Sequence, residues 1–139
     1  IISEQPQADA LPAEAWYAAR IRAGIPEIYA DTAGHLLPQA LNLEALGGFS
    51  RDKSGYIGHE ALAQQKNHRH LAIARVPALA SGQRTLYDAK EKSVGTLLDY
   101  GHAEDGTLVQ AVIEDRALGK ALHLADDDQT LTFKAVAAK

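Results

Sequence analysis

The chain has no cysteine, and its aromatic residues are few: one tryptophan, two phenylalanines and five tyrosines in 139 residues. Without cysteine it cannot hold a disulfide framework, a thiolate nucleophile or a cysteine-ligated metal or iron–sulfur cluster. This absence fits a reducing compartment, and we expect a cytoplasmic protein. No apolar run approaches the roughly 18 residues of a membrane span, so no membrane partner is expected.

The beginning of the sequence also lacks two common features. The stretch IISEQPQADALPAE has no basic segment followed by an apolar one, so it does not resemble a signal peptide. It has no initiator methionine either. We therefore expect the sequence to begin inside a longer chain and to have the missing upstream part of the same protein as a partner.

An excess of positive charge is missing as well. The formal net charge is −4, which argues against a protein whose main task is to clamp nucleic acid. The one basic cluster, residues 66–75 (KNHRHLAIAR), is short and leads into an alternating apolar segment. We expect no direct binding to nucleic acid. Hydrophobic residues make up 46% of the chain and charged residues 23%, both ordinary for a globular protein.

Helix signals occur only in the first half of the chain. Good helix formers follow Pro12 and end at Gly24, and a second helix, HEALAQQK, begins near Gly58. A short helix is also expected over NLEAL (42–46), with Asn42 as its cap and Gly47 at its end.

Beyond residue 67 the segments are short and β-capable, with turn residues between several of them. The expected strands are RHLAIARV, RTLYDA, SVGTLLDY, TLVQAVIED, KALHL and QTLTFKAV. In RHLAIARV, the alternation of Leu71 and Ile73 predicts one buried face, with a bend that accommodates Val76 out of phase. Six such strands suggest a small antiparallel barrel or sandwich.

The fold class expected from these patterns is α+β. Residues 1–66 are interpreted as the end of a larger α/β domain, and residues 67–139 as a small antiparallel β-barrel. The expected contributors to the core of the barrel are Leu71, Ile73, Leu97, Val109, Val112, Leu131 and Phe133.

The stretch KSGYIGHE (53–60) is the main candidate for a site. Gly55 and Gly58 permit positive φ and close approach of the backbone to a ligand. Lys53 can meet a carboxylate or phosphate, and Tyr56 can stack on a flat ring. The alternative is a strand–turn–helix junction, in which Lys53 and Glu60 are solvated and Tyr56 belongs to the core.

The other chemically suggestive residues favour ordinary structural roles. His68 and His70 share a face of an expected strand, but no further ligand lies at a recognisable spacing, so no metal is predicted. The run Asp126 to Asp128 lacks the spacing of a calcium loop and is interpreted as a hairpin turn. No residue is assigned a catalytic role.

Three ordered motifs carry a resemblance to a known family. RIRAGIP (20–26), LPQALNLEALGG (37–48) and KSGYIGHE match the patterns R-I-x-x-G-I-P, P-x-x-x-N-L-E-x-L-G-G and K-G-C-Y-x-G-Q-E in order and in near-identical spacing. The chain resembles the folate-binding proteins of the YgfZ family over about residues 15–136. That family is related to the aminomethyltransferase (T-protein) of the glycine cleavage system.

One departure from the pattern concerns the thiol of that family. Gly55 stands where the YgfZ motif has its cysteine, which puts any role of that thiol in doubt here. Aminomethyltransferases also lack the cysteine, and DKSGYIGHEAL (52–62) is similar to their D-K-G-D-F-I-G-R-E-A-L. Both relationships therefore stay open.

The resemblance implies a tetrahydrofolate-binding fold, with tetrahydrofolate or a derivative as ligand. Arg20 matches a helix arginine of the family that could hold the glutamate tail of the folate, and Lys53, Tyr56 and Glu60 match the signature loop as folate-binding residues. Ser54, Gly55, Gly58 and His59 complete that loop.

The function implied is non-catalytic maintenance of iron–sulfur enzymes, including those that modify tRNA, with iron–sulfur proteins as partners. One alternative is an aminomethyltransferase that uses tetrahydrofolate and a lipoylated carrier protein. The other is a diverged interaction scaffold that binds no folate.

Overall fold

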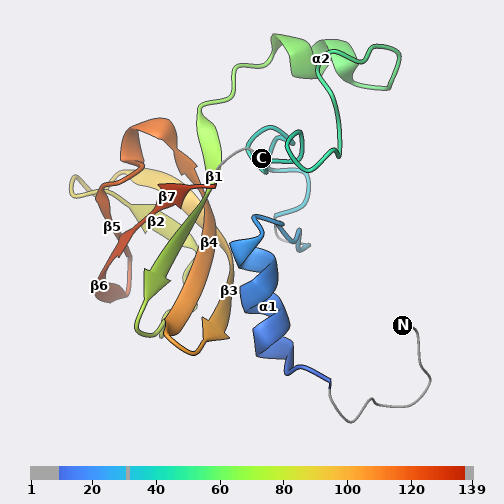
Figure 1. Cartoon of the computed structure of the whole chain (residues 1–139). Coiled ribbons are helices and arrows are strands. Elements are labelled where there is room, and N and C mark those ends of the chain that lie inside the picture. Colours follow the sequence, from blue (N-terminus) through green and yellow to red (C-terminus); the bar gives the residue numbers. More distant parts are fainter. Residues whose placement is uncertain (1–9, 31, 137–139) are drawn as a thin grey trace.

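Helices occupy the first half of the chain and strands the second (Figure 1). The structure is a computed structural model, and it describes residues 10–30 and 32–136. The helices are α1 (Ala13–Arg22) and α2 (His59–Gln64). The strands are β1 (Arg69–Val76), β2 (Thr85–Tyr87), β3 (Ser93–Ala103), β4 (Gly106–Glu114), β5 (Ala121–Leu124), β6 (Asp127–Thr132) and β7 (Lys134–Ala135), with a 3₁₀ turn, η1 (Asp115–Ala117), before β5.

The seven strands form one curled antiparallel sheet in the order β6-β5-β2-β3-β4-β1-β7 (Figure 1). Strands β2, β3 and β4 are neighbours in sequence and in space, whereas β1 joins the far side of β4 and β7 then pairs with β1. Strands β6 and β7 stand at the two ends, and no ladder joins them within residues 32–136. The expected antiparallel β-structure is confirmed as a half-barrel.

The segment QTLTFKAV was expected to be one strand, but it is divided between β6 and β7. Phe133 lies between the two strands, and its side chain is fully buried in the core. The chain changes partner at this point, because β6 pairs with β5 and β7 pairs with β1.

The concave side of the curled sheet holds the largest hydrophobic cluster. Its buried members are Ala72, Ala74, Val76, Leu86, Val94, Leu97, Val109, Ala111, Ile113, Ala117, Leu122, Leu124, Leu131 and Phe133. The outer side is covered too, because Leu71, Leu98 and Val112 pack against Ala40 and Leu41. The central strands are therefore buried on both faces.

This double burial corrects the prediction for β1. Leu71 and Ile73 were expected to face the core alone, but Ala72, Ala74 and Val76 face the inner cluster, while Leu71 and Ile73 face the outer layer. The ladder with β4 continues without a register shift from Arg69 to Val76, so the strand needs no bend. Of the seven expected core residues, only Ile73 is not fully buried.

Helix α1 lies on the outer side of the sheet, across β3 and β4 (Figure 1). Pro12 is its N-cap, and Gly24 takes a positive φ of 69° just after its end. The helix buries Ala18 and Ile21 against Leu108. It can approach this closely because Gly101 has no side chain: a Cβ there would lie 2.6 Å from the backbone nitrogen of Ala18.

The helix expected over residues 42–46 is absent, and the chain from Pro38 to Gly47 forms successive turns instead. Asn42 has a φ of 60°, a conformation that a right-handed helix cannot contain. The last turn closes where the N–H of Gly48 donates to the carbonyl of Leu43 at 2.7 Å.

Helix α2 begins near Gly58 as expected, and it stands apart from the strands (Figure 1). None of its residues is fully buried. One link to the rest of the chain is a hydrogen bond of 3.1 Å from the Gln39 amide to the Leu62 carbonyl. Within residues 10–30 and 32–136, no helix is long and apolar enough to cross a membrane.

Candidate functional site

The first candidate site is a surface hollow of about 590 Å³ beside the stretch KSGYIGHE, called here the loop hollow. Two of the expected folate-binding residues, Lys53 and Tyr56, line it. The remaining lining residues come from the preceding turns and are Glu44, Gly47, Gly48, Phe49 and Ser50. The hollow thus combines one cation, one anion and two aromatic rings.

Short-range contacts hold the shape of this loop. The Tyr56 hydroxyl donates to the carbonyl of Ser50 at 3.3 Å, and the His59 ring meets the Tyr56 ring edge-on, with 5.3 Å between their centroids. The Arg51 guanidinium lies 2.9 Å from the Glu44 carboxylate. The Tyr56 hydrogen bond thus joins the loop to the segment before it, and the Arg51–Glu44 pair joins that segment to the preceding turns.

The two glycines of the loop have the backbone conformation that the sequence suggests. Gly55 has a φ of 90° and Gly58 a φ of 88°, values that side-chain-bearing residues rarely adopt. Nothing lies within 4 Å of the position of a Cβ at Gly55, so a side chain there has space but a strained backbone. The turn therefore favours glycine at the position of the family cysteine.

The other expected loop residues do not line the loop hollow. Glu60 lies on α2, is exposed and does not line the loop hollow. Ser54, Gly55 and Gly58 are exposed as well, and His59 is half-buried, with its ring edge-on to that of Tyr56. Tyr56 is half-buried, so it is neither exposed like Lys53 nor fully buried like a core residue.

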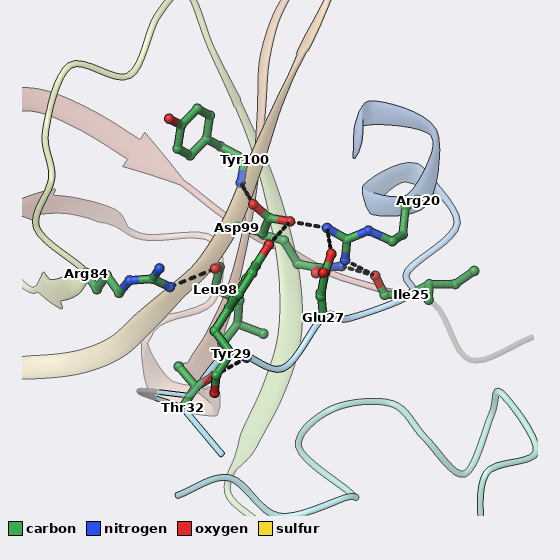
Figure 2. Close-up of polar contacts among 10 residues, drawn as sticks. Arg20, Ile25, Glu27, Tyr29, Thr32, Arg84, Leu98, Asp99 and Tyr100 are labelled. Carbon is green, nitrogen blue, oxygen red and sulfur yellow. Dashed lines mark hydrogen bonds and ion pairs between the residues drawn. The ribbon is translucent and has the colours of Figure 1, made fainter. Parts of the chain in front are cut away.

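The second candidate site surrounds Arg20, the remaining expected folate-binding residue (Figure 2). Arg20 is 6% exposed, and its guanidinium forms an ion pair with Asp99 of β3 and another, of 2.9 Å, with Glu27. It also donates to the carbonyl of Ile25 at 3.2 Å. Its charge is thus used within the protein, and a folate carboxylate would have to exchange places with Asp99 or Glu27.

A β-bulge directs Asp99 toward α1. The register between β3 and β4 shifts between Leu97 and Asp99, which makes Leu98 the additional residue. Leu98 packs in the outer cluster, and Asp99 also meets the outer layer, through Arg20. The bulge therefore allows two consecutive residues to contact the segment that covers the sheet.

Tyr29 completes this cluster and is strongly perturbed. Its hydroxyl donates to the Asp99 carboxylate at 3.1 Å (Figure 2). Burial, followed by the nearby negative charge of Asp99, raises the pKa of the Tyr29 phenol to about 12. Tyr29 is therefore a hydrogen-bond donor over the whole neutral range.

Three buried polar atoms beneath the outer layer have no hydrogen-bond partner in the described part of the chain: Nε of Arg20, Oε1 of Gln39 and Oε1 of Gln110. The Gln110 amide donates to the carbonyl of Ile25 at 3.4 Å, so one end of this side chain is paired and the other is not. These unpaired atoms cost stability and mark the seam between the sheet and its covering segment.

No local pattern in the sequence indicated that Asp99 would pair with Arg20, that Tyr29 would donate to Asp99, or that Gln110 would share the Ile25 carbonyl with Arg20. The Arg20–Asp99 pair joins residues 79 positions apart in the chain. Among the described residues, Arg20 does not line the loop hollow, so the structure does not bring the expected folate-binding residues into one site.

The described residues contain no group of three or more histidine, aspartate or glutamate side chains able to hold a metal ion. His70 lies 2.9 Å from Asp115, and the His123 ring lies 3.3 Å from Glu91, both as single pairs. The aspartates at 126–128 lie at the turn from β5 into β6, where the Asp127 carboxylate accepts from the N–H of Gln129 at 2.9 Å.

No family model matches the chain. Among solved structures, the chain is similar to glycine cleavage system aminomethyltransferase T from Bartonella henselae, with a TM-score of 0.49 and 14% sequence identity. The match covers 63% of this chain and 27% of that one, so the aligned part is about a quarter of the length of that protein. At this level, the likeness concerns the path of the backbone alone.

Proposed function

We propose that this chain is part of a YgfZ-like protein that binds tetrahydrofolate and is not a catalyst by itself. The three ordered motifs at residues 20–26, 37–48 and 53–60 support the relationship. The observation that carries the proposal is the loop hollow: Lys53 and Tyr56, taken from the third motif, line one cavity together with Phe49.

The chemistry of the loop hollow suits a folate. Its volume of about 590 Å³ lies within the range of small-molecule pockets. A flat pterin or aminobenzoyl ring can stack on Tyr56 or Phe49, and a glutamate carboxylate can pair with Lys53. We retain Arg20 and Glu60 as proposed folate contacts on the resemblance alone.

The wider role follows from the same resemblance. We propose that residues 1–66 are the end of a folate-binding domain, to which the upstream part of the protein contributes. Maintenance of iron–sulfur enzymes, including those that modify tRNA, is the proposed task of the whole protein in the cytoplasm.

Calorimetry with tetrahydrofolate on the full-length protein tests the site. Replacement of Lys53 and Tyr56 by alanine should weaken binding about tenfold or more, because a charge-assisted contact and a stacking surface are both lost. The matched control is Lys120→Ala with Tyr100→Ala, which removes the same residue types from exposed positions outside the loop hollow. Equal affinities of the two double variants would reject the loop hollow as the folate site.

An aminomethyltransferase is the second candidate, and the stretch DKSGYIGHEAL (52–62) favours it by its similarity to the D-K-G-D-F-I-G-R-E-A-L of those enzymes. The φ of 90° at Gly55 suits glycine and disfavours the side chain that either family has at this position, so it does not separate the two. Incubation of the full-length protein with tetrahydrofolate and an aminomethylated lipoyl carrier distinguishes the two functions. Formation of methylenetetrahydrofolate would establish the enzyme, whereas binding without turnover supports the non-catalytic role. Absence of folate binding would leave the interaction scaffold.

A further inference from the structure

A second hollow gathers basic side chains from two distant segments, and the folate proposal does not use it. Called here the basic hollow, it has a volume of about 300 Å³ and is lined by His35, Leu36, Leu37, Ala40, Lys66, Asn67, His68 and Arg69. Four of these eight residues are lysine, arginine or histidine, and none is acidic. In a chain of net charge −4, this is a local concentration of positive charge.

The backbone around the basic hollow is held in place. The Asn67 amide donates to the carbonyl of Arg69 at 2.7 Å and its oxygen accepts from the N–H of Arg69 at 3.2 Å, which fixes the turn into β1. The carbonyl of His68 accepts from the N–H of Asp115 at 3.0 Å. On the other wall, Ala40 packs in the same outer cluster as Leu71 of β1.

The side chains at the rim, in contrast, are largely available. Within residues 10–30 and 32–136, no hydrogen bond or ion pair engages the side chain of His35, Lys66 or His68. Arg69 has one neighbour of opposite charge, Glu114, at 3.9 Å, and both partners are partly exposed. A fixed backbone that presents uncommitted cationic groups is suited to an external anion.

We propose that the basic hollow binds the phosphate group of a small organic phosphate monoester. A phosphate dianion offers three acceptor oxygens and balances the two permanent charges of Lys66 and Arg69, while the imidazoles of His35 and His68 supply further N–H donors. The apolar floor of Leu36, Leu37 and Ala40 accommodates the organic part. A carboxylate, with two oxygens and one charge, satisfies fewer of these donors.

The basic hollow shares no residue with the loop hollow. The proposal therefore holds or fails independently of folate binding.

Titration of the ¹⁵N-labelled full chain with phenyl phosphate, followed by NMR, tests the site. We expect saturable shifts centred on the amides of residues 35–37 and 66–69. The double variant Lys66→Gln/Arg69→Gln should weaken binding about tenfold or more, because two charge-assisted contacts are lost. His35→Ala, on the other wall and without a partner of its own in the described chain, should weaken it by a smaller factor and disturb the fold least.

The matched control is Arg22→Gln/Arg75→Gln. It removes one positive charge at the opposite end of β1, six residues and about 20 Å from Arg69, and a second at the end of α1. Both arginines are partly exposed and pair with Asp105, outside the basic hollow, so phenyl phosphate affinity should not change.

Three results would overturn the proposal. The first is absence of saturable binding, or binding that the Lys66/Arg69 variant and the control retain equally. The second is benzoate binding as tightly as phenyl phosphate, which would remove the preference for phosphate. The third is a short single-stranded RNA that shifts these amides while phenyl phosphate does not, which would assign the surface to nucleic acid.

Discussion

At the scale of single residues, the Arg20–Asp99 pair joins two charged side chains that are both largely buried. Asp99 is 13% exposed and Arg20 is 6% exposed, so neither charge is well solvated. A buried charge that loses its partner costs far more than an exposed one, because water cannot replace the partner. The only other carboxylate paired with Arg20 in the described chain is Glu27, whose side chain is 44% exposed.

Asp99→Asn should therefore lower the free energy of unfolding by about 3 kcal/mol. The matched control is Asp105→Asn, which breaks the exposed pairs with Arg22 and Arg75 and should cost no more than about 1 kcal/mol. Denaturant unfolding of both variants measures the difference. Similar midpoints for the two would show that the Arg20–Asp99 pair contributes no more than a surface contact.

Tyr29 gives the same cluster a pH dependence. An exposed tyrosine in the unfolded chain has a pKa near 10, and in the folded protein the pKa is raised to about 12. Between these values the unfolded state has lost the proton that the folded state keeps, so stability falls as pH rises. The contribution is fully present below pH 10 and is lost as pH approaches 12.

Stability measured from pH 9 to 12 should decline more steeply in the wild-type protein than in Tyr29→Phe, which cannot titrate at this position. Tyr100→Phe, at an exposed site, should follow the wild-type curve. If the curve of Tyr29→Phe were superimposable on that of the wild type, the tyrosine would titrate normally in the folded state.

At the scale of elements, the position of α1 depends on one missing side chain in β3. Gly101 lies against the backbone of Tyr17 and Ala18, and its φ is not in the left-handed region. A substitution there tests close packing alone, without backbone strain. Gly82 offers the comparison, because nothing lies within 4 Å of its Cβ position and its φ is also not left-handed.

Gly101→Ala should destabilise the protein by about 1–3 kcal/mol, since the new methyl group must push α1 away from the sheet. Gly82→Ala should be neutral or slightly stabilising, because it only restricts the unfolded chain. Thermal unfolding provides the comparison, and amide exchange in α1 reports whether the helix has loosened. Equal stabilities would mean that α1 shifts without loss of contacts.

The elements differ in how far sequence could predict them. Helix α1 and β1 to β5 were predictable because propensity, Pro12, Gly24 and the turn residues are local signals. The phase of β1 was not, because a strand buried on both faces has no alternation to reveal which apolar residues point inward. The helix expected after Asn42 was wrong for another reason. Asparagine is a good N-cap, but here Asn42 takes a left-handed conformation within a turn.

The candidate sites differ in the same respect, because contacts within one turn were predictable from the sequence and contacts between distant segments were not. Lys53 and Tyr56 share the loop hollow because they are three residues apart in one turn. The partners of Arg20 and the meeting of His35 with Lys66 depend on long-range packing, which a single sequence does not encode in any local pattern.

At the scale of the whole molecule, residues that precede the strands cover part of the outer face of the sheet. Leu71, Leu98 and Val112 lie on that surface and pack against Ala40 and Leu41, and Leu108 packs against Ala18 and Ile21. The strands and the segment before them therefore share one core in two layers. Removal of the segment before the strands would expose contiguous apolar area on the outer face of the sheet.

A chain reduced to residues 67–139 should consequently fail to fold as a stable monomer. We expect it to bind a hydrophobic dye such as anilinonaphthalene sulfonate and to elute as larger species in size-exclusion chromatography, whereas residues 1–139 should do neither. Cooperative unfolding of a dye-free monomeric fragment would contradict this and would show that the strands form an independent unit.

The strand order also determines the order in which the strands can pair during synthesis. Strand β1 leaves the ribosome before the other six strands of the described sheet, yet its main partner is β4, with Arg69 opposite Glu114. Strands β2, β3 and β4 can pair with their immediate neighbours as they emerge. Strand β1 must wait for the meander to be completed, and β7, which follows the other strands in sequence, adds to β1 later still. Pairing between segments so far apart in the chain is slow. The apolar side chains of β1 therefore need protection until β4 is available to pair with it.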